Sequence, residues 1–146
     1  LPVDMKAGTA NFGSEDQYLD LLQRFRSSFI PEATASIQAA LKARDSDALS
    51  KAVHRLKGSA GYVGAGALFQ VCSETRTAIA AKGATWRKSE QQATAVLAEV
   101  KRVLAFLERN DKVRAFFDAD QKGAGEVAQS GDDASQDGSL SSLEMC

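Results

Sequence analysis

The sequence is poor in the residues that build metal sites and disulfide frameworks. It contains one histidine, His54, and two cysteines, Cys72 and Cys146, that lie far apart. This set offers neither paired cysteines nor a tetrahedral zinc ligand group, so we expect no metal site. No apolar run approaches the roughly 18 residues of a membrane span, and the first residues lack the apolar core of a signal peptide. We therefore expect a cytoplasmic protein without a membrane segment, and the nucleus is a second location. The start at Leu1 indicates a fragment or a processed product.

Phosphate-binding loops are also missing. The chain has no GxxxxGK[ST] motif and no GxGxxG motif after a strand, so we expect no nucleotide site and no ATP-dependent kinase activity. A catalytic triad would need His54 as its base, and no nucleophile is evident beside it. An enzyme that uses His54 as a general base is therefore the weakest of the functional hypotheses.

Charge is unevenly distributed although the net charge is −1. Seven of the 19 acidic residues and one of the 18 basic residues lie from Asp118 onward, in a segment rich in Gly, Ser, Gln and Asp. This composition predicts a disordered acidic tail over residues 118–146. The remainder has 17 basic and 12 acidic residues (18 − 1 and 19 − 7), a net charge of about +5. We expect no nucleic-acid partner.

The body of the chain has the pattern of amphipathic helices. Ala, Leu, Gln, Lys and Arg dominate, and period-two β-branched runs are absent. We expect a helix from about Ser14, kinked or restarted at Pro31, and a turn over residues 44–47. Further helices are predicted over about 47–63, 65–81 and from Trp86 to about Phe117. The fold class is therefore all-α: an antiparallel four-helix bundle over 14–117, with an N-terminal extension over 1–13 that adds a helical segment.

The helix over residues 47–63 carries the histidine on its polar side. At about 100° per residue, its apolar residues share one face and His54 lies roughly 160° from the centre of that face. The apolar set is Ala48, Leu49, Ala52, Val53, Leu56, Ala60 and Val63. We expect His54 to point into solvent.

Two glycines and a lysine accompany the histidine on the same outer strip. Gly58 and Gly61 each cost about 1 kcal/mol relative to Ala in a helix, so we infer that they leave the imidazole accessible to another macromolecule. Lys57 lies one turn from His54, where it would face an anion on the ring. Cys72 and the aromatic residues at helical spacing are interpreted as core.

The run His54-Arg55-Leu56-Lys57-Gly58-Ser59-Ala60-Gly61-Tyr62-Val63-Gly64 resembles the signature of histidine-containing phosphotransfer (HPt) domains. That family has His-x-x-Lys-Gly, one or two small residues, and a Gly about ten positions after the His. The resemblance covers roughly residues 14–117 and includes an apolar Leu68 and a Cys at Cys72.

The resemblance implies a role for each matching residue. His54 would be the phosphoacceptor, Lys57 would stabilise the phosphoryl group, and Gly58 would open access to the ring. Many members place Gln or Glu 22 positions after the His, but this chain has Arg76 there and Glu74 two residues earlier. Arg76 would pair with the phosphoryl group instead of orienting the ring.

The resemblance also implies the partners. Receiver domains of response regulators or hybrid histidine kinases would supply the phosphorylatable Asp and Mg²⁺, so no cofactor is expected in this chain. Ser50, Lys51 and Arg55, with Gly58 and Gly61, would form the access and docking surface. The leading hypothesis is a monomeric phosphorelay intermediate, and the alternative is a scaffold that binds receivers without carrying phosphate.

Overall fold

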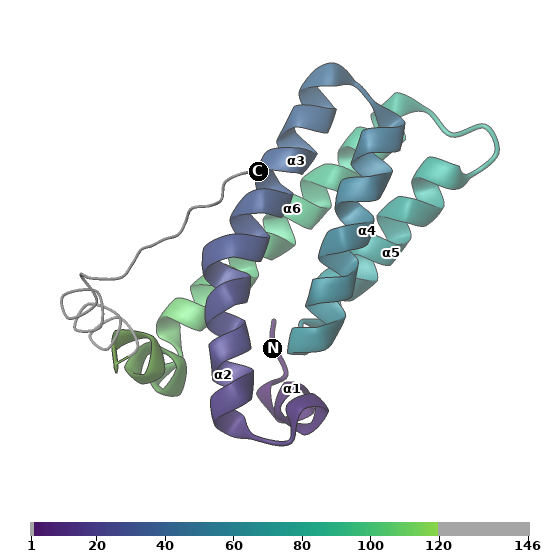
Figure 1. Ribbon diagram of the computed structural model, residues 1–146. Helices are drawn as coiled ribbons and strands as arrows, with labels where there is room; N and C mark the ends of the chain where they lie inside the picture. The colour runs from purple at the N-terminus through teal and green to yellow at the C-terminus, as the bar shows by residue number, and fades with distance from the viewer. Residues whose placement is uncertain (1, 120–146) are drawn as a thin grey trace, which may run out of the picture. The chain divides into compact units, whose positions relative to one another are not determined.

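The computed structural model describes residues 2–119, and residues 2–110 form one compact unit. The helices of this unit follow one another with short connections (Figure 1). They are α1 (Met5–Phe12), α2 (Glu15–Arg24), a π-helical turn η1 (Phe25–Phe29), α3 (Ile30–Ala43), α4 (Ser46–Val63), α5 (Gly66–Ala80) and α6 (Trp86–Arg109). The described residues contain no strand, so the all-α class is confirmed.

Helices α3 to α6 form a four-helix bundle. Each packs against the next along the chain, and α6 returns to α3 (Figure 1). Short links join α3 to α4 and α4 to α5, which makes consecutive helices antiparallel. The core between them is aliphatic, with Ile37, Leu49, Val53, Leu68 and Val96 fully buried.

Side-chain caps start the helices where the sequence indicates. Ser14, Asp45 and Thr85 precede α2, α4 and α6, and each accepts a hydrogen bond from a backbone N–H in the first turn. Gly64 ends α4 in the left-handed conformation, at φ 83°. These predicted boundaries of α4 are therefore right to within one residue.

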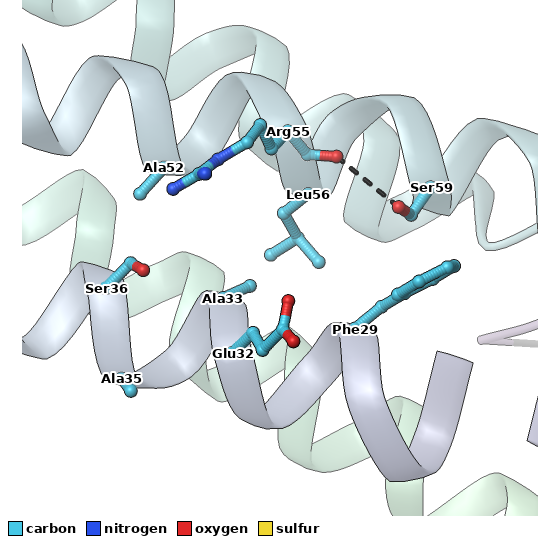
Figure 2. Close-up of a pocket in the computed structure, with 9 residues that line it drawn as sticks. All are labelled: Phe29, Glu32, Ala33, Ala35, Ser36, Ala52, Arg55, Leu56 and Ser59. Carbon is cyan, nitrogen blue, oxygen red and sulfur yellow. Dashed lines mark hydrogen bonds between the residues drawn. The ribbon is translucent and has the colours of Figure 1, made fainter. Parts of the chain in front are cut away.

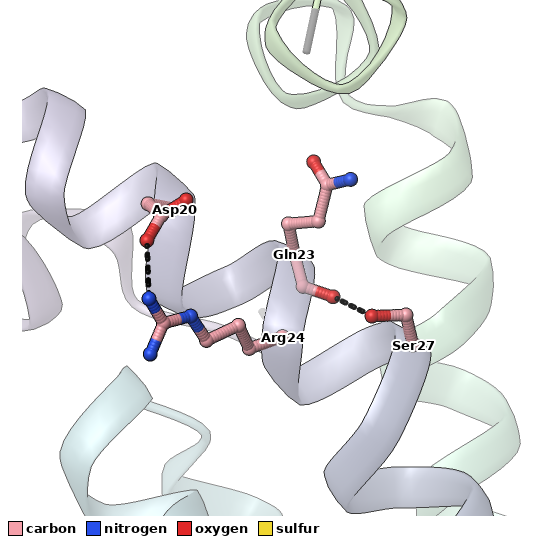
Figure 3. A network of polar contacts seen from close by, with 4 residues as sticks. All are labelled: Asp20, Gln23, Arg24 and Ser27. Carbon is pink, nitrogen blue, oxygen red and sulfur yellow. Dashed lines mark hydrogen bonds and ion pairs between the residues drawn. The ribbon is translucent and has the colours of Figure 1, made fainter. Parts of the chain in front are cut away.

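Pro31 marks the start of a new α-helical segment, which is one of the two outcomes expected for it. It lies in the first turn of α3, directly after the wider π turn η1. Because proline has no N–H for the carbonyl one turn back, the normal α-helical bond cannot form there. Two side-chain contacts lie beside this turn: the Ser27 hydroxyl donates to the Gln23 carbonyl at 2.8 Å, and Arg24 pairs with Asp20 at 3.4 Å (Figure 3).

The N-terminal residues are integral to the unit. Helix α1 packs on α2 and α4, and Val3 is fully buried. The Asp4 N–H donates to the Gly64 carbonyl at 2.8 Å, and Gly8 lies against the Tyr18 ring with no room for a Cβ. The helical segment predicted before Ser14 thus covers one end of α4.

The last helix of the unit is shorter than predicted. Helix α6 ends at Arg109 and its cap is Asn110, whose N–H donates to the Phe106 carbonyl at 3.0 Å. A separate helical stretch spans 111–119 and belongs to a second unit that begins at Asp111. Of the predicted acidic tail, residues 118 and 119 end this stretch, and the remainder lies outside the described residues.

Candidate functional site

Helix α4 presents the histidine on the side opposite the core. Six of the seven apolar residues predicted to face inward are buried, and Ala48 is half-buried. His54 is exposed, as its place on the helical wheel predicts. The buried face holds α4 against α3 and α5, so the imidazole is carried on a rigid element.

An open depression surrounds the ring. It is lined by Asp47, Ser50, Lys51, His54, Arg55 and Arg76. The structure thus brings together four of the predicted site residues of α4, with Arg76 from α5. Three of the side chains are cationic, and Lys51 pairs with Asp47 at 3.2 Å on the exposed surface. The depression therefore has a positive balance suited to an anionic group.

Arg76 reaches the histidine directly. Its Nη1 lies 3.0 Å from Nδ1 of His54. The side chain 22 positions after the histidine thus lies beside the imidazole ring, and in this chain that side chain is a cation. Glu74 does not approach the ring, because its carboxylate accepts a hydrogen bond from Gln70 at 3.2 Å on the same helix.

The Lys57 side chain extends toward α5. Its Nζ lies 5.2 Å from the centroid of the Phe69 ring, in a cation–π arrangement. The predicted role of Lys57 at the phosphoryl group stays a prediction.

The two glycines of the outer strip have different surroundings. A Cβ at Gly58 would meet nothing within 4 Å, which agrees with an access role. A Cβ at Gly61 would lie 3.2 Å from the Phe69 ring. The absent side chain at Gly61 therefore makes room for α5, which is a packing reason that the helical wheel could not show.

Three aromatic side chains lie at the surface, and one of them, Phe29, was expected in the core. Phe29 and Phe69 are each 39% exposed, and Tyr62 is 62% exposed. Phe29 and Arg55 line a groove between α3 and α4 that continues to Ser59 and Leu56 (Figure 2). A second groove, beside Gly58 and Tyr62, also includes Phe29. Sequence reasoning missed the exposure of Phe29 because helical spacing alone does not separate a buried aromatic ring from one at the edge of the stripe.

Cys72 is a core residue, as interpreted from its position. It is fully buried on α5, and this burial raises the pKa of its thiol to about 12, against a smaller opposite effect of Lys57. A thiol with such a pKa is a poor nucleophile near neutral pH.

Residues 2–119 contain neither a cluster of metal-ligating side chains nor a helix suited to crossing a membrane. This part of the chain has no group of three or more metal-ligating side chains. Within the same residues, no helix combines the length and the apolar composition needed to cross a bilayer.

Comparison with known families agrees with this geometry. The model of the Hpt domain matches residues 20–110, which is more than half of the chain and includes α3 to α6 entirely. No curated protein and no solved structure matches the chain with statistical significance. On the evidence of this match, the protein belongs to the Hpt domain family.

Proposed function

We propose that the protein is a phosphorelay intermediate that accepts a phosphoryl group on His54 from the aspartate of one receiver domain and passes it to another. The observation that carries the proposal is the exposed His54 ring in a cationic depression on a rigid helix. The histidine lies within the part of the chain that matches the Hpt family. A neutral imidazole is a nucleophile through the lone pair of its unprotonated nitrogen.

The chain would contribute position and charge to the transfer. Phosphoryl transfer passes through a loose, in-line transition state, so catalysis consists mainly of alignment and charge neutralisation. Helix α4 fixes the direction of the imidazole, and the cations Lys51, Arg55 and Arg76 lie around it. Gly58 leaves open space one turn away, where the surface of a partner can approach. The partner receiver would supply the aspartate and Mg²⁺.

The partner surface would combine charge with exposed aromatic rings. Cationic side chains complement an acidic receiver site and accelerate encounter. The grooves lined by Phe29 and Tyr62 adjoin Arg55 and Gly58, so apolar contacts and the transfer site share one side of α4. The chain would act as a monomer, since one exposed His54 suffices for the reaction. A cytoplasmic location, or a nuclear one as well, remains part of this prediction.

Transfer from a phosphorylated receiver tests the proposal. We expect radiolabel to move from a phosphorylated receiver domain to the wild-type chain, and none to reach His54→Gln. Because His54 is exposed, the variant should fold normally, which a thermal unfolding curve verifies. Lys101→Gln, on the exposed side of α6, is the matched surface control and should be labelled like wild type. Label on His54→Gln would refute the proposal.

The alternative function is a scaffold of the same fold. It predicts that a receiver binds the chain, as measured by calorimetry, while no label moves to it. The orientation of His54 into an open depression favours the carrier, because a scaffold has no need of an exposed nucleophile.

A further inference from the structure

The contact between Arg76 and His54 determines where the ring carries its proton. Guanidinium has five N–H donors and no acceptor, and it stays protonated in proteins. At 3.0 Å from Nη1, the Nδ1 atom of His54 must therefore present its lone pair. A neutral imidazole whose Nδ1 accepts a hydrogen bond carries its single proton on Nε2.

This arrangement conflicts with nucleophilic attack. Nδ1 is covered by Arg76, so Nε2 is the ring nitrogen that a partner can reach, and it has no hydrogen-bond partner among residues 2–119. A protonated Nε2 has no lone pair for phosphorus. The resting contact and a nucleophilic Nε2 are thus mutually exclusive, because Arg76 cannot accept a proton held on Nδ1.

Arg76 also has unused capacity to bind an anion. In the described part of the chain no carboxylate pairs with it: Asp47 pairs with Lys51, and Glu74 accepts from Gln70. The Nε atom of Arg76 is buried without an acceptor, which costs free energy in the resting arrangement. A phosphoryl group offers three acceptor oxygens and a negative charge, to which guanidinium binds more strongly than to a neutral nitrogen.

We propose that Arg76 is a positioning residue whose guanidinium alternates between two contacts. In the unphosphorylated chain it donates to Nδ1 and keeps the proton on Nε2, which masks the nucleophile. When the phosphoryl group arrives, Arg76 leaves the ring and pairs with the phosphoryl oxygens. This inference rests on the proposed function. It adds that Nε2 becomes nucleophilic only when an anionic phosphoryl donor draws Arg76 away from the ring.

The proton and the electron pairs balance in this sequence. As Arg76 withdraws, Nε2 gives its proton to water and Nδ1 takes one from water, so the ring stays neutral. The Nε2 lone pair then forms the N–P bond, and the P–O bond to the donor aspartate breaks with its electron pair on the carboxylate. The product has the phosphoryl group on Nε2 and the proton on Nδ1, the atom that Arg76 has vacated.

The resting half is tested by the ¹⁵N chemical shifts of the His54 ring, recorded at pH 9 where imidazole is ordinarily neutral. The chain has one histidine, so its signals need no assignment. We expect the Nε2–H tautomer in wild type. Arg76→Gln and Arg76→Glu offer an acceptor and should shift the ring to Nδ1–H. Arg109→Gln, an exposed arginine in the last turn of α6, should match wild type. An Nδ1–H tautomer in wild type, or no shift in either variant, overturns the inference.

The loaded half is tested by the lifetime of the phosphohistidine. The chain is phosphorylated with phosphoramidate, the donor is removed, and ³¹P NMR follows the decay at pH 8. Losing a charge-assisted contact to the phosphoryl group should make Arg76→Gln decay about threefold faster or more, whereas Arg109→Gln should decay like wild type. Equal lifetimes in wild type and Arg76→Gln overturn this half.

The two readouts separate this inference from the proposed function. The tautomer is measured without any phosphoryl donor. If a receiver labels His54 while the resting ring is Nδ1–H, the relay role stands and the masking role of Arg76 falls. If neither phosphoramidate nor a receiver labels His54, the relay role falls together with the loaded half, and the tautomer alone is retained.

Discussion

The two halves of helix α4 differ in what surrounds their outer side. Residues 46–58 carry His54 beside an open depression and contact other helices mainly through the buried face. Residues 59–64 are covered on several sides: Phe69 lies against Gly61, Asp4 bonds to Gly64, and Tyr18 donates to the Val63 carbonyl at 2.6 Å. One end of the helix is thus anchored, and the reactive half projects from that anchor.

The comparison shows that glycine is favoured at three positions of one motif for three different physical reasons. Gly58 leaves space empty, Gly61 makes room for a ring, and Gly64 supplies a left-handed backbone against the Asp4 carbonyl. Only the first of these is a property that a partner could use. Substitutions in the anchored half should therefore change mainly the free energy of unfolding. Substitutions in the reactive half should change mainly the rate of phosphoryl transfer.

The largest effect is expected at the anchored end, for Gly64→Ala. Its φ of 83° costs an L-residue about 1–2 kcal/mol, and its Cβ would fall on the Asp4 carbonyl, which cannot move without breaking the bond to Gly64. We expect a loss of about 2–4 kcal/mol of unfolding free energy in urea, with the overlap adding to the backbone cost.

Gly83→Ala is the matched control for this substitution. Its φ is 80°, but a Cβ there would meet nothing within 4 Å, so only the backbone cost applies, about 1–2 kcal/mol. Equal losses at the two positions would show that docking of the N-terminal residues contributes nothing to the anchor.

The anchor is also the part of the fold that the sequence predicted least well. The helix boundaries at Ser14, Asp45 and Gly64 follow from local capping chemistry, which is readable in a few adjacent residues. The docking of Val3 and Gly8 depends on residues far away in the chain, and no periodicity marks it. The same holds at the reactive half: the outward direction of His54 follows from the helical period, but its contact with Arg76 arises only when α5 packs on α4.

An intermediate effect is expected for Tyr18→Phe. The Tyr18 side chain is fully buried, and its hydroxyl donates to the Val63 carbonyl. Removing the hydroxyl leaves a buried acceptor without this donor, which costs about 1–3 kcal/mol. Urea unfolding at pH 8 measures the loss, and a variant as stable as wild type would show that this hydrogen bond does not hold the anchor.

The difference in unfolding free energy between wild type and Tyr18→Phe should depend on pH. Burial raises the pKa of the Tyr18 phenol well above its usual value of 10, and the Asp4 carboxylate adds to the shift. The folded chain then holds the phenol proton more tightly than the unfolded chain, so this stability is complete below pH 10 and is lost as the pH rises above it. The advantage of wild type over Tyr18→Phe should therefore shrink between pH 10 and pH 11. A difference in unfolding free energy that stays constant over this pH range would contradict the prediction.

The smallest effects are expected for Gly58→Ala and Gly61→Ala, which lie on either side of the boundary between the two halves. Alanine in place of an exposed helical glycine stabilises by about 1 kcal/mol. Gly58→Ala should gain this amount, since its Cβ meets nothing. Gly61→Ala should gain less, because the Phe69 ring at 3.2 Å must first give way.

Receiver-dependent labelling of the same two variants then separates access from packing. If the open space at Gly58 serves the approach of a partner, Gly58→Ala will be the more stable protein and the slower phosphoacceptor. The Phe69 ring already lies over residue 61 in the wild type, so the labelling rate of Gly61→Ala should stay closer to that of the wild type. The opposite order would mean that the space beside Phe69, and not the one beside His54, limits the approach, and the docking surface would then be centred on residues 61–69.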